Sequence, residues 1–344
     1  MAIAAKIPLG ILSERVGRWS IIPAIAIGQT ASLLLYSIVP NTTWFYPIRI
    51  FHALTLAALF PTAVAIALDL APPGKRGETT GKFLTSIGVA TLFGPFLCFF
   101  LVNYVDYVQL FRLVSIIPLL GLAPFLLIRK KSSHTLSTKE GNSSLLVFWK
   151  DIAFSQNMLV LNYLSIAFSF ANAFFTTLFA VHARNNFLLG PSVIALLFGV
   201  KGITNMLSRI PSGKLLDKIG YRWPIYLAFT MYTLTYLTIS EADNTHLLIF
   251  AMAIQGLAHG MKAVAEWSLL GDCSPSGTEN ITAAYLGTTH SIGAALGAVA
   301  AGALSIILDI QTIFKLASLI VLTGLLAATQ IKKTGDLSHQ SAHA

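Results

Sequence analysis

Long apolar segments follow one another along almost the whole chain, and no other feature limits its fold as much. About 20 apolar residues in a helix cross the hydrocarbon core of a bilayer. Only 11% of the residues are charged, against about a quarter in soluble domains. The sequence therefore predicts an all-α integral membrane protein with spans at about 21–39, 45–69, 83–103, 110–128, 153–181, 191–212, 223–240, 246–270, 282–307 and 311–331.

A short motif occurs twice, 203 positions apart, and each copy lies between two apolar segments. The first copy reads KIPLGILSERVGR at 6–18 and the second reads RIPSGKLLDKIGY at 209–221. The register continues without insertion, so that Asp69 matches Asp272 and Gly94 matches Gly297. The chain is therefore predicted to consist of two related halves.

The polar segments divide the chain. We expect an N-terminal transmembrane half at 1–128, a cytoplasmic linker at 129–152, a C-terminal transmembrane half at 153–331 and a polar tail at 332–344. The second half begins its first helix about sixty residues before Gly213, whereas only residues 1–9 precede the corresponding Gly10. We therefore count about eleven spans of about 20 residues, the one at 1–11 partial, and expect about fifty further residues upstream of Met1, encoding helix one and the start of helix two.

The positive charges concentrate in alternate connections. Short cytoplasmic loops of membrane proteins are enriched in Lys and Arg, which predicts that these connections and the C-terminus are cytoplasmic. The same distribution accounts for most of the net charge of +9 and makes a nucleic-acid-binding surface unnecessary. The bases in question are Arg15, Arg18, Lys75, Arg76, Lys82, Arg129, Lys130, Lys131, Lys139, Lys150, Lys214, Lys218, Arg222, Lys332 and Lys333.

Enzyme signatures are missing from the sequence. It contains neither a Gly-rich ATP phosphate loop nor a nucleophile elbow. Its two cysteines, Cys98 and Cys273, have no metal-ligand spacing. We therefore expect a membrane protein that is not an enzyme and that uses no metal or cofactor.

Polar residues recur at helical spacing inside three apolar segments of the second half. Such stripes either join helices or line a water-filled cavity, and charged members favour the cavity. In the first half Arg49 lies just inside the outer end of its segment, where it could also reach the interface. The candidate substrate- and ion-binding residues are Arg49, Asn162, Lys201, Asn205, His259, Lys262 and Glu266.

Lys262 and Glu266 are four residues apart, so they share a helix face and can pair. Protonation of Glu266 would then release Lys262 to hold an anionic or polar group of a solute. The alternative is a structural ion pair that only fixes its helix.

At the motif the sequence resembles the major facilitator superfamily of secondary transporters, whose pattern in this loop is Gly-x-Leu-Ala-Asp-Arg-x-Gly-Arg. Glu14 replaces the Asp in the first copy, and Tyr221 replaces the last Arg in the second. A second family pattern, which begins with an Arg in helix four, matches Arg49, Pro61, Asp69, Pro72, Arg76, Gly77 and Gly81. Gly94-Pro95 is similar to the helix-packing signature of drug–proton antiporters, although Cys98-Phe99 stand where a Gly pair is usual.

The resemblance implies a gate at the cytoplasmic loops, where Glu14 faces the start of span 282–307 and Arg18 pairs with Asp69. This contact would form in one transport state and break in the other; otherwise the charges only anchor loops. The predicted gate residues are Gly10, Glu14, Arg15, Gly17, Arg18, Asp69, Arg76, Gly213, Asp217, Lys218, Gly220 and Asp272.

The resemblance also implies a function: transport of small organic solutes by alternating access, with a monomer in the cell membrane exporting its substrate at the expense of a proton gradient. Import or exchange of an organic anion is an alternative, because Arg49, Lys201 and Lys262 outnumber Glu266 within the spans. A second alternative is a truncated membrane scaffold that does not transport.

Overall fold

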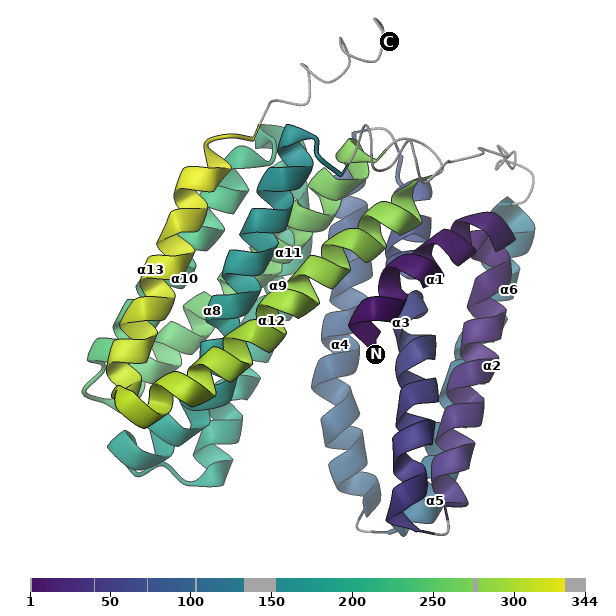
Figure 1. Cartoon of the computed structure of the whole chain (residues 1–344), viewed down its shortest axis with the longest axis horizontal. Coiled ribbons are helices and arrows are strands. Elements are labelled where there is room, and N and C mark those ends of the chain that lie inside the picture. Colours follow the sequence, from purple (N-terminus) through teal and green to yellow (C-terminus); the bar gives the residue numbers. More distant parts are fainter. Residues whose placement is uncertain are drawn as a thin grey trace, which may run out of the picture. The chain divides into compact units, whose positions relative to one another are not determined.

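Helices are the only regular elements in the residues that the structure describes, which are 2–39, 41–72, 74–102, 104–132, 153–274 and 278–331 of this computed structural model (Figure 1). The first half contains α1 (Ala2–Val16), α2 (Arg18–Ser37), α3 (Phe45–Asp69), α4 (Arg76–Val102), α5 (Tyr107–Val114) and α6 (Ile116–Ser132), with a short 3₁₀ turn η1 (Thr42–Trp44). The second half contains α8 (Gln156–Phe187), α9 (Pro191–Ile219), α10 (Arg222–Glu241), α11 (Thr245–Cys273), α12 (Glu279–Ile307) and α13 (Ile310–Ala328).

The predicted spans coincide with these helices, and the all-helical membrane fold is confirmed. Eight helical stretches of the described residues are long and apolar enough to cross a membrane, with α5 and the first part of α6 forming one of them. Helix α10 is less apolar because it carries hydroxyl groups, but Tyr232, Thr235 and Tyr236 are fully buried. The predicted tail at 332–344 and most of the predicted linker lie outside the described residues.

The motif forms less of a loop than the sequence predicts. Helix α1 continues through Gly10 to Val16, and α9 continues through Gly213 to Ile219. The turn is concentrated at Gly17 and Gly220, whose φ angles are 90° and 78°. Glycine adopts such positive φ angles without the steric cost that other residues meet. Gly10 and Gly213 therefore lie within helices and not at the turn, and their role is the close approach of neighbouring helices, described below.

By its internal contacts the described chain divides into two units. Unit 1 comprises Met1–Ile66, Phe93–Lys150 and Ser274–Thr288, and unit 2 comprises Ala67–Leu92, Asp151–Cys273 and Thr289–Ala344. Each unit thus includes one segment from the other half of the sequence. These two segments hold the first turns of α4 and of α12, which occupy equivalent places in the 203-residue repeat.

Unit 1 is built around α2. This helix lies against α5 and α6, and its residues Ile21 and Ile25 form an apolar core with Ala58 of α3. A polar contact joins the same two helices where Gln29 Nε2 donates to Thr55 Oγ1 over 2.6 Å. The first half of the sequence therefore packs through both apolar and polar side chains.

Unit 2 is a helix bundle in which α11 packs against α9 and α10, while α13 packs against α8 and α10 (Figure 1). Large aromatic side chains such as Phe168, Phe229 and Tyr232 fill its interior. The backbones of α9 and α11 approach closely because Gly256 and Gly260 of α11 lack side chains. A Cβ on Gly256 would lie 2.3 Å from the carbonyl oxygen of Lys201, as is typical of small residues spaced four apart in membrane helices.

Candidate functional site

The second copy of the motif packs against the first turns of α4 within unit 2. A Cβ on Gly213 would lie 2.2 Å from the carbonyl oxygen of Gly77, and one on Gly81 would lie 2.6 Å from the carbonyl oxygen of Arg209. Real Cβ atoms essentially never approach that closely. The glycines of both helices therefore allow direct contact between the backbones of α4 and α9.

Asp217 of α9 caps the N-terminus of α4. Its carboxylate accepts hydrogen bonds from the backbone N–H groups of Gly77 at 2.8 Å and Glu78 at 2.9 Å. The first N–H groups of a helix have no partner within the helix, and the helix dipole favours a negative charge beside them. The sequence analysis expects this kind of contact from Glu14; the structure has it at Asp217.

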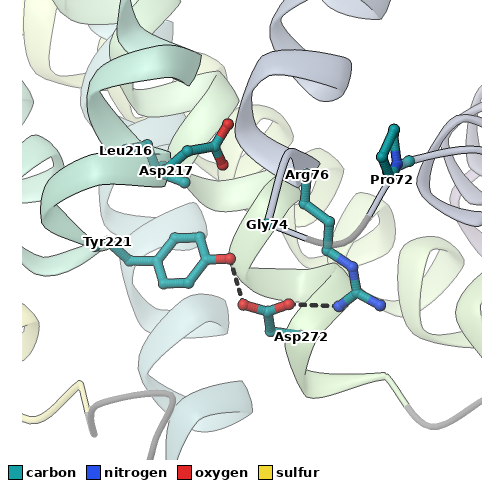
Figure 2. A pocket seen from close by; sticks show the side chains of 9 residues that line it. Pro72, Gly74, Arg76, Leu216, Asp217, Tyr221 and Asp272 are labelled. Carbon is teal, nitrogen blue, oxygen red and sulfur yellow. Dashed lines mark hydrogen bonds and ion pairs between the residues drawn. The ribbon is translucent and has the colours of Figure 1, made fainter.

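Asp272 of α11 joins two further groups beside this cap (Figure 2). One carboxylate oxygen pairs with the Arg76 guanidinium and the other accepts a hydrogen bond from the Tyr221 hydroxyl. Burial, and then the neighbouring Asp272 carboxylate, raise the pKa of Tyr221, so its phenol stays protonated and donates. Together with Asp217, these side chains line a cavity of about 540 Å³.

The first copy of the motif packs against the first turns of α12 within unit 1. A Cβ on Gly10 would lie 2.8 Å from the Cβ of Ala284, and Asn280 Nδ2 donates to Ser13 Oγ over 3.1 Å. Arg18 forms an ion pair with Glu279, the first residue of α12, and these side chains are only 10% and 13% exposed. Gly10 and Gly213 thus have the same role, which is close helix packing.

The repeat register relates the charges of the two contacts. Counted 203 positions on, Arg18 corresponds to Tyr221 and Arg76 corresponds to Glu279. The base is therefore in the motif in one copy and at the start of the opposing helix in the other. Glu279 and Tyr221 are not among the predicted gate residues, although the repeat register matches them with Arg76 and Arg18.

For several other predicted gate residues, the described part of the structure gives a position but does not test the predicted role. The side chains of Glu14 and Arg15 lie outside the described residues, Lys218 is exposed on the last turn of α9, and the predicted pairing of Arg18 with Asp69 stays a prediction. A Cβ built on Gly94 would meet nothing within 4 Å. The Pro95 side chain is outside the described residues, so the packing role of this pair also stays a prediction.

A buried ion pair lies inside unit 2, on α11. Lys262 Nζ is 2.5 Å from Glu266 Oε2, and the two side chains are 4% and 7% exposed. The ammonium group also lies 4.1 Å from the centroid of the Phe168 ring on α8. The spacing of four residues predicts this pair correctly, and the surroundings show that it is enclosed by protein.

The polar stripe of α9 faces the same region. Lys201 Nζ lies 4.3 Å from the centroid of the Phe175 ring, and Asn205 Oδ1 accepts a hydrogen bond of 3.0 Å from Arg209 Nε. Lys201, Lys262 and Arg209 all act electrostatically on His259 of α11. The structure thus groups five of the seven predicted binding residues and adds Arg209, which the sequence predicts only as part of the motif. The five are Lys201, Asn205, His259, Lys262 and Glu266.

Two predicted binding residues lie elsewhere. Asn162 of α8 donates to the carbonyl oxygen of Met158 and accepts from Thr289 Oγ1 of α12, so its amide joins helices. Arg49 of α3 is exposed in unit 1. No group of three or more His, Cys, Asp or Glu side chains in the described ranges is arranged to hold a metal ion.

The model of the Major Facilitator Superfamily matches residues 1–187 and 163–340. The chain belongs to this family, whose members bind small-molecule substrates and lie in the lipid bilayer.

Individual relatives are distant. An uncharacterized MFS-type transporter of Methanocaldococcus jannaschii is 24% identical over 96% of this chain and 86% of its own length. A multi-drug resistance efflux pump, PmrA, of Streptococcus pneumoniae is 22% identical over 91% of this chain and 78% of its own length. Among solved structures, the human organic anion transporter MFSD10 (TETRAN) has a TM-score of 0.79 at 16% identity, over 95% of this chain and 80% of that one. The structural likeness shows the fold alone.

Proposed function

We propose that the protein is a proton-coupled transporter of small organic solutes that works by alternating access, with Glu266 as the proton-binding group. The buried Lys262–Glu266 pair carries this proposal. Ionisable groups within membrane helices are costly and usually serve a function. Protonation neutralises Glu266 and releases the Lys262 ammonium, whereas loss of the proton restores the pair.

The contacts at the motif copies support the second part of the proposal, which is the change between two states. The Asp217 cap of α4 and the Arg18–Glu279 pair each join segments from different halves of the sequence. We propose that they form in one state and break in the other. A solute shifts such an equilibrium only by the difference between its affinities for the two states.

Export in exchange for protons is the first candidate mode, because a relative in this family is named as a multi-drug efflux pump. Uptake or exchange of organic anions is the second, and the surplus of cations around His259 favours it. The two modes differ in how protonation changes the affinity for the solute. Export in exchange for protons requires that protonation weakens solute binding, whereas uptake together with protons requires that it strengthens solute binding.

The proposed location is the cell membrane, with the C-terminus in the cytoplasm. Single cysteines at positions 139 and 333 are then protected in intact cells from an impermeant thiol reagent. Cysteines at positions 41, 106 and 243 are labelled. Labelling at 139 without labelling at 243 contradicts this orientation.

Proton coupling is tested in liposomes that contain the purified chain and a trapped pH-sensitive dye, with no initial pH gradient. The added solutes are benzenesulfonate, benzamide and benzyltrimethylammonium, which share a ring, differ in charge and release no proton themselves. Solute entry acidifies the lumen in cotransport and makes it alkaline in exchange. We expect Glu266→Gln to abolish either pH change while solute-for-solute exchange continues.

The matched control is Glu241→Gln, which alters a carboxylate that is 67% exposed and paired with Lys315. This variant should move protons like the parent. Glu266→Gln liposomes that still move protons with the solute at the parental rate would overturn the coupling role and leave the pair as a structural one.

A further inference from the structure

The interior of unit 2 contains more positive than negative side chains. Lys201 and Arg209 of α9 and Lys262 of α11 all act on His259, whereas Glu266 is the acid of the group and is paired with Lys262. An isolated charge within a membrane helix is costly unless it meets a partner or water. The two cations of α9 therefore need an explanation that the Lys262–Glu266 pair does not give.

Arg209 is the clearest example of a buried cation for which the described residues provide no carboxylate partner. Its side chain is among the buried charged groups, with 7% of the residue exposed, and its Nε donates to Asn205. Its Nη1 has no hydrogen-bond partner in the described part of the chain. The Gly88 position of α4 lies beside this nitrogen, since a Cβ there would be 3.4 Å away. A guanidinium group has five N–H donors and cannot lose its charge, so this cation is buried with donors unused.

Lys201 lies two turns earlier on the same face of α9. Its ammonium group contacts the Phe175 ring, and it forms no ion pair with any described residue. A cation over an aromatic ring is stabilised less than one paired with a carboxylate, and the ammonium retains three N–H donors. Lys201 and Arg209 thus form two cationic positions with one polar residue, Asn205, between them.

Donors from α11 face the same place. Gln255 is fully buried, and apart from its interaction with the Tyr236 hydroxyl on α10 its amide makes no hydrogen bond within the described residues. His259 Nδ1 also lacks one. Gly256 and Gly260 bring this helix against the backbone of α9, so these groups and the α9 cations belong to one site.

We propose that this site binds the anionic group of the transported solute, a carboxylate, sulfonate or phosphonate, between Lys201 and Arg209 of α9 and the Gln255 and His259 side chains of α11. The inference rests on the proposed transport function and names its substrate class. An oxyanion accepts strong charge-assisted hydrogen bonds from guanidinium and ammonium groups. It supplies the negative charge that the α9 side chains lack.

The site also fixes the sign of proton coupling. The groups that face Glu266 are Lys262 on its own helix and Tyr232 on α10. His259, next to them, faces Lys201 and Arg209 of α9 and His290 of α12. A proton on Glu266 releases Lys262 and makes the surroundings more positive, so the anion and the proton bind together and cross in the same direction. This proposal therefore favours uptake of an organic anion with a proton over export in exchange for protons.

Binding is tested without transport, by thermal unfolding of the purified full chain in detergent with each of the three ring compounds. Benzenesulfonate should raise the melting temperature of the parent, and benzamide and benzyltrimethylammonium should not. Arg209→Gln and Lys201→Gln should each raise, by about tenfold or more, the benzenesulfonate concentration needed for the same increase in melting temperature. This is the change expected for loss of a charged hydrogen bond. Arg222→Gln, at an exposed position outside the cluster, is the matched control and should bind like the parent.

Arg209→Gln gives a second readout. Removing an uncompensated buried cation should raise the melting temperature of the unliganded protein, whereas a structural arginine would lower it. Equal stabilisation of the parent by all three compounds, or an unchanged sulfonate effect in both variants, overturns the proposal. Sulfonate binding together with proton movement unchanged by Glu266→Gln would retain the anion site and remove only the proposed coupling.

Discussion

The two copies of the motif close similar contacts, but the base lies in a different place in each. In unit 1 the base is Arg18, the last residue of the motif, and the acid is Glu279 at the start of α12. In unit 2 the base is Arg76 at the start of α4, and the last motif residue is the uncharged Tyr221; both meet Asp272 of α11. The departure of Tyr221 from the family pattern is therefore compensated by the base at position 76.

The contacts also differ in how closely the helices approach. In unit 2 two glycines face each other, and the Cβ of an alanine at 213 would lie 2.2 Å from a backbone oxygen. In unit 1 the Cβ of an alanine at 10 would lie 2.8 Å from the Cβ of Ala284. The nearest backbone oxygen to such a Cβ is 2.2 Å away at position 213 but 3.1 Å away at position 10, so the α4–α9 contact tolerates less change than the α1–α12 contact.

The largest effect is expected from Glu279→Arg, which places a second cation against Arg18. Both side chains are about nine-tenths buried, and breaking a buried pair costs about 3 kcal/mol or more. We expect a clear fall in melting temperature and at least a tenfold loss of solute exchange in liposomes. Glu241→Arg makes the same change at an exposed pair, where about 0–1 kcal/mol is at stake. Equal effects of the two variants would mean that the buried Arg18–Glu279 pair contributes no more to stability and exchange than an exposed ion pair does.

Gly213→Ala should come next. The added methyl group overpacks the α4–α9 contact, which typically costs about 1–3 kcal/mol, and slows exchange accordingly. Gly10→Ala should cost less. Gly199→Ala lies on the same helix as Gly213 with nothing within 4 Å of its Cβ, and serves as the control. Urea or thermal unfolding gives the stability of the three variants. A Gly10→Ala variant less stable than Gly213→Ala would contradict the claim that the α4–α9 contact is the less tolerant of the two.

Tyr221→Phe should have the smallest effect, because Arg76 still pairs with Asp272. Loss of a hydrogen bond to a charged group costs about 1.5 kcal/mol at the low end. Burial beside Asp272 raises the pKa of Tyr221, so the bond is fully present below the ordinary tyrosine pKa of about 10. The loss of stability should therefore be constant up to about pH 9. A difference from the parent that changes between neutral pH and that limit would show that the phenol ionises.

Much of the fold follows from the sequence, because a membrane helix must be apolar over a length fixed by the bilayer. The Lys262–Glu266 pair also follows, since spacing along one helix decides it. The extent of the motif helices is not predictable in this way: Gly10 and Gly213 are compatible with either a turn or close packing, and the opposing helix decides between them. Glu279 pairs with Arg18 only because α12 lies against the first motif copy, and the anion site proposed for Arg209 and Gln255 depends on the packing of α9 against α11. Local patterns contain neither of these contacts.

The different place of the base in the two contacts is tested most directly by a double-mutant cycle on Arg18 and Glu279, in which melting temperature and solute exchange are measured. Arg18→Tyr with Glu279→Arg gives positions 18 and 279 the residues that unit 2 has at 221 and 76, and it removes the two facing cations that Glu279→Arg alone creates. We predict that the double variant regains most of the stability and exchange that Glu279→Arg loses, with a coupling energy of about 1 kcal/mol or more. A double variant no better than the worse single variant would contradict the account.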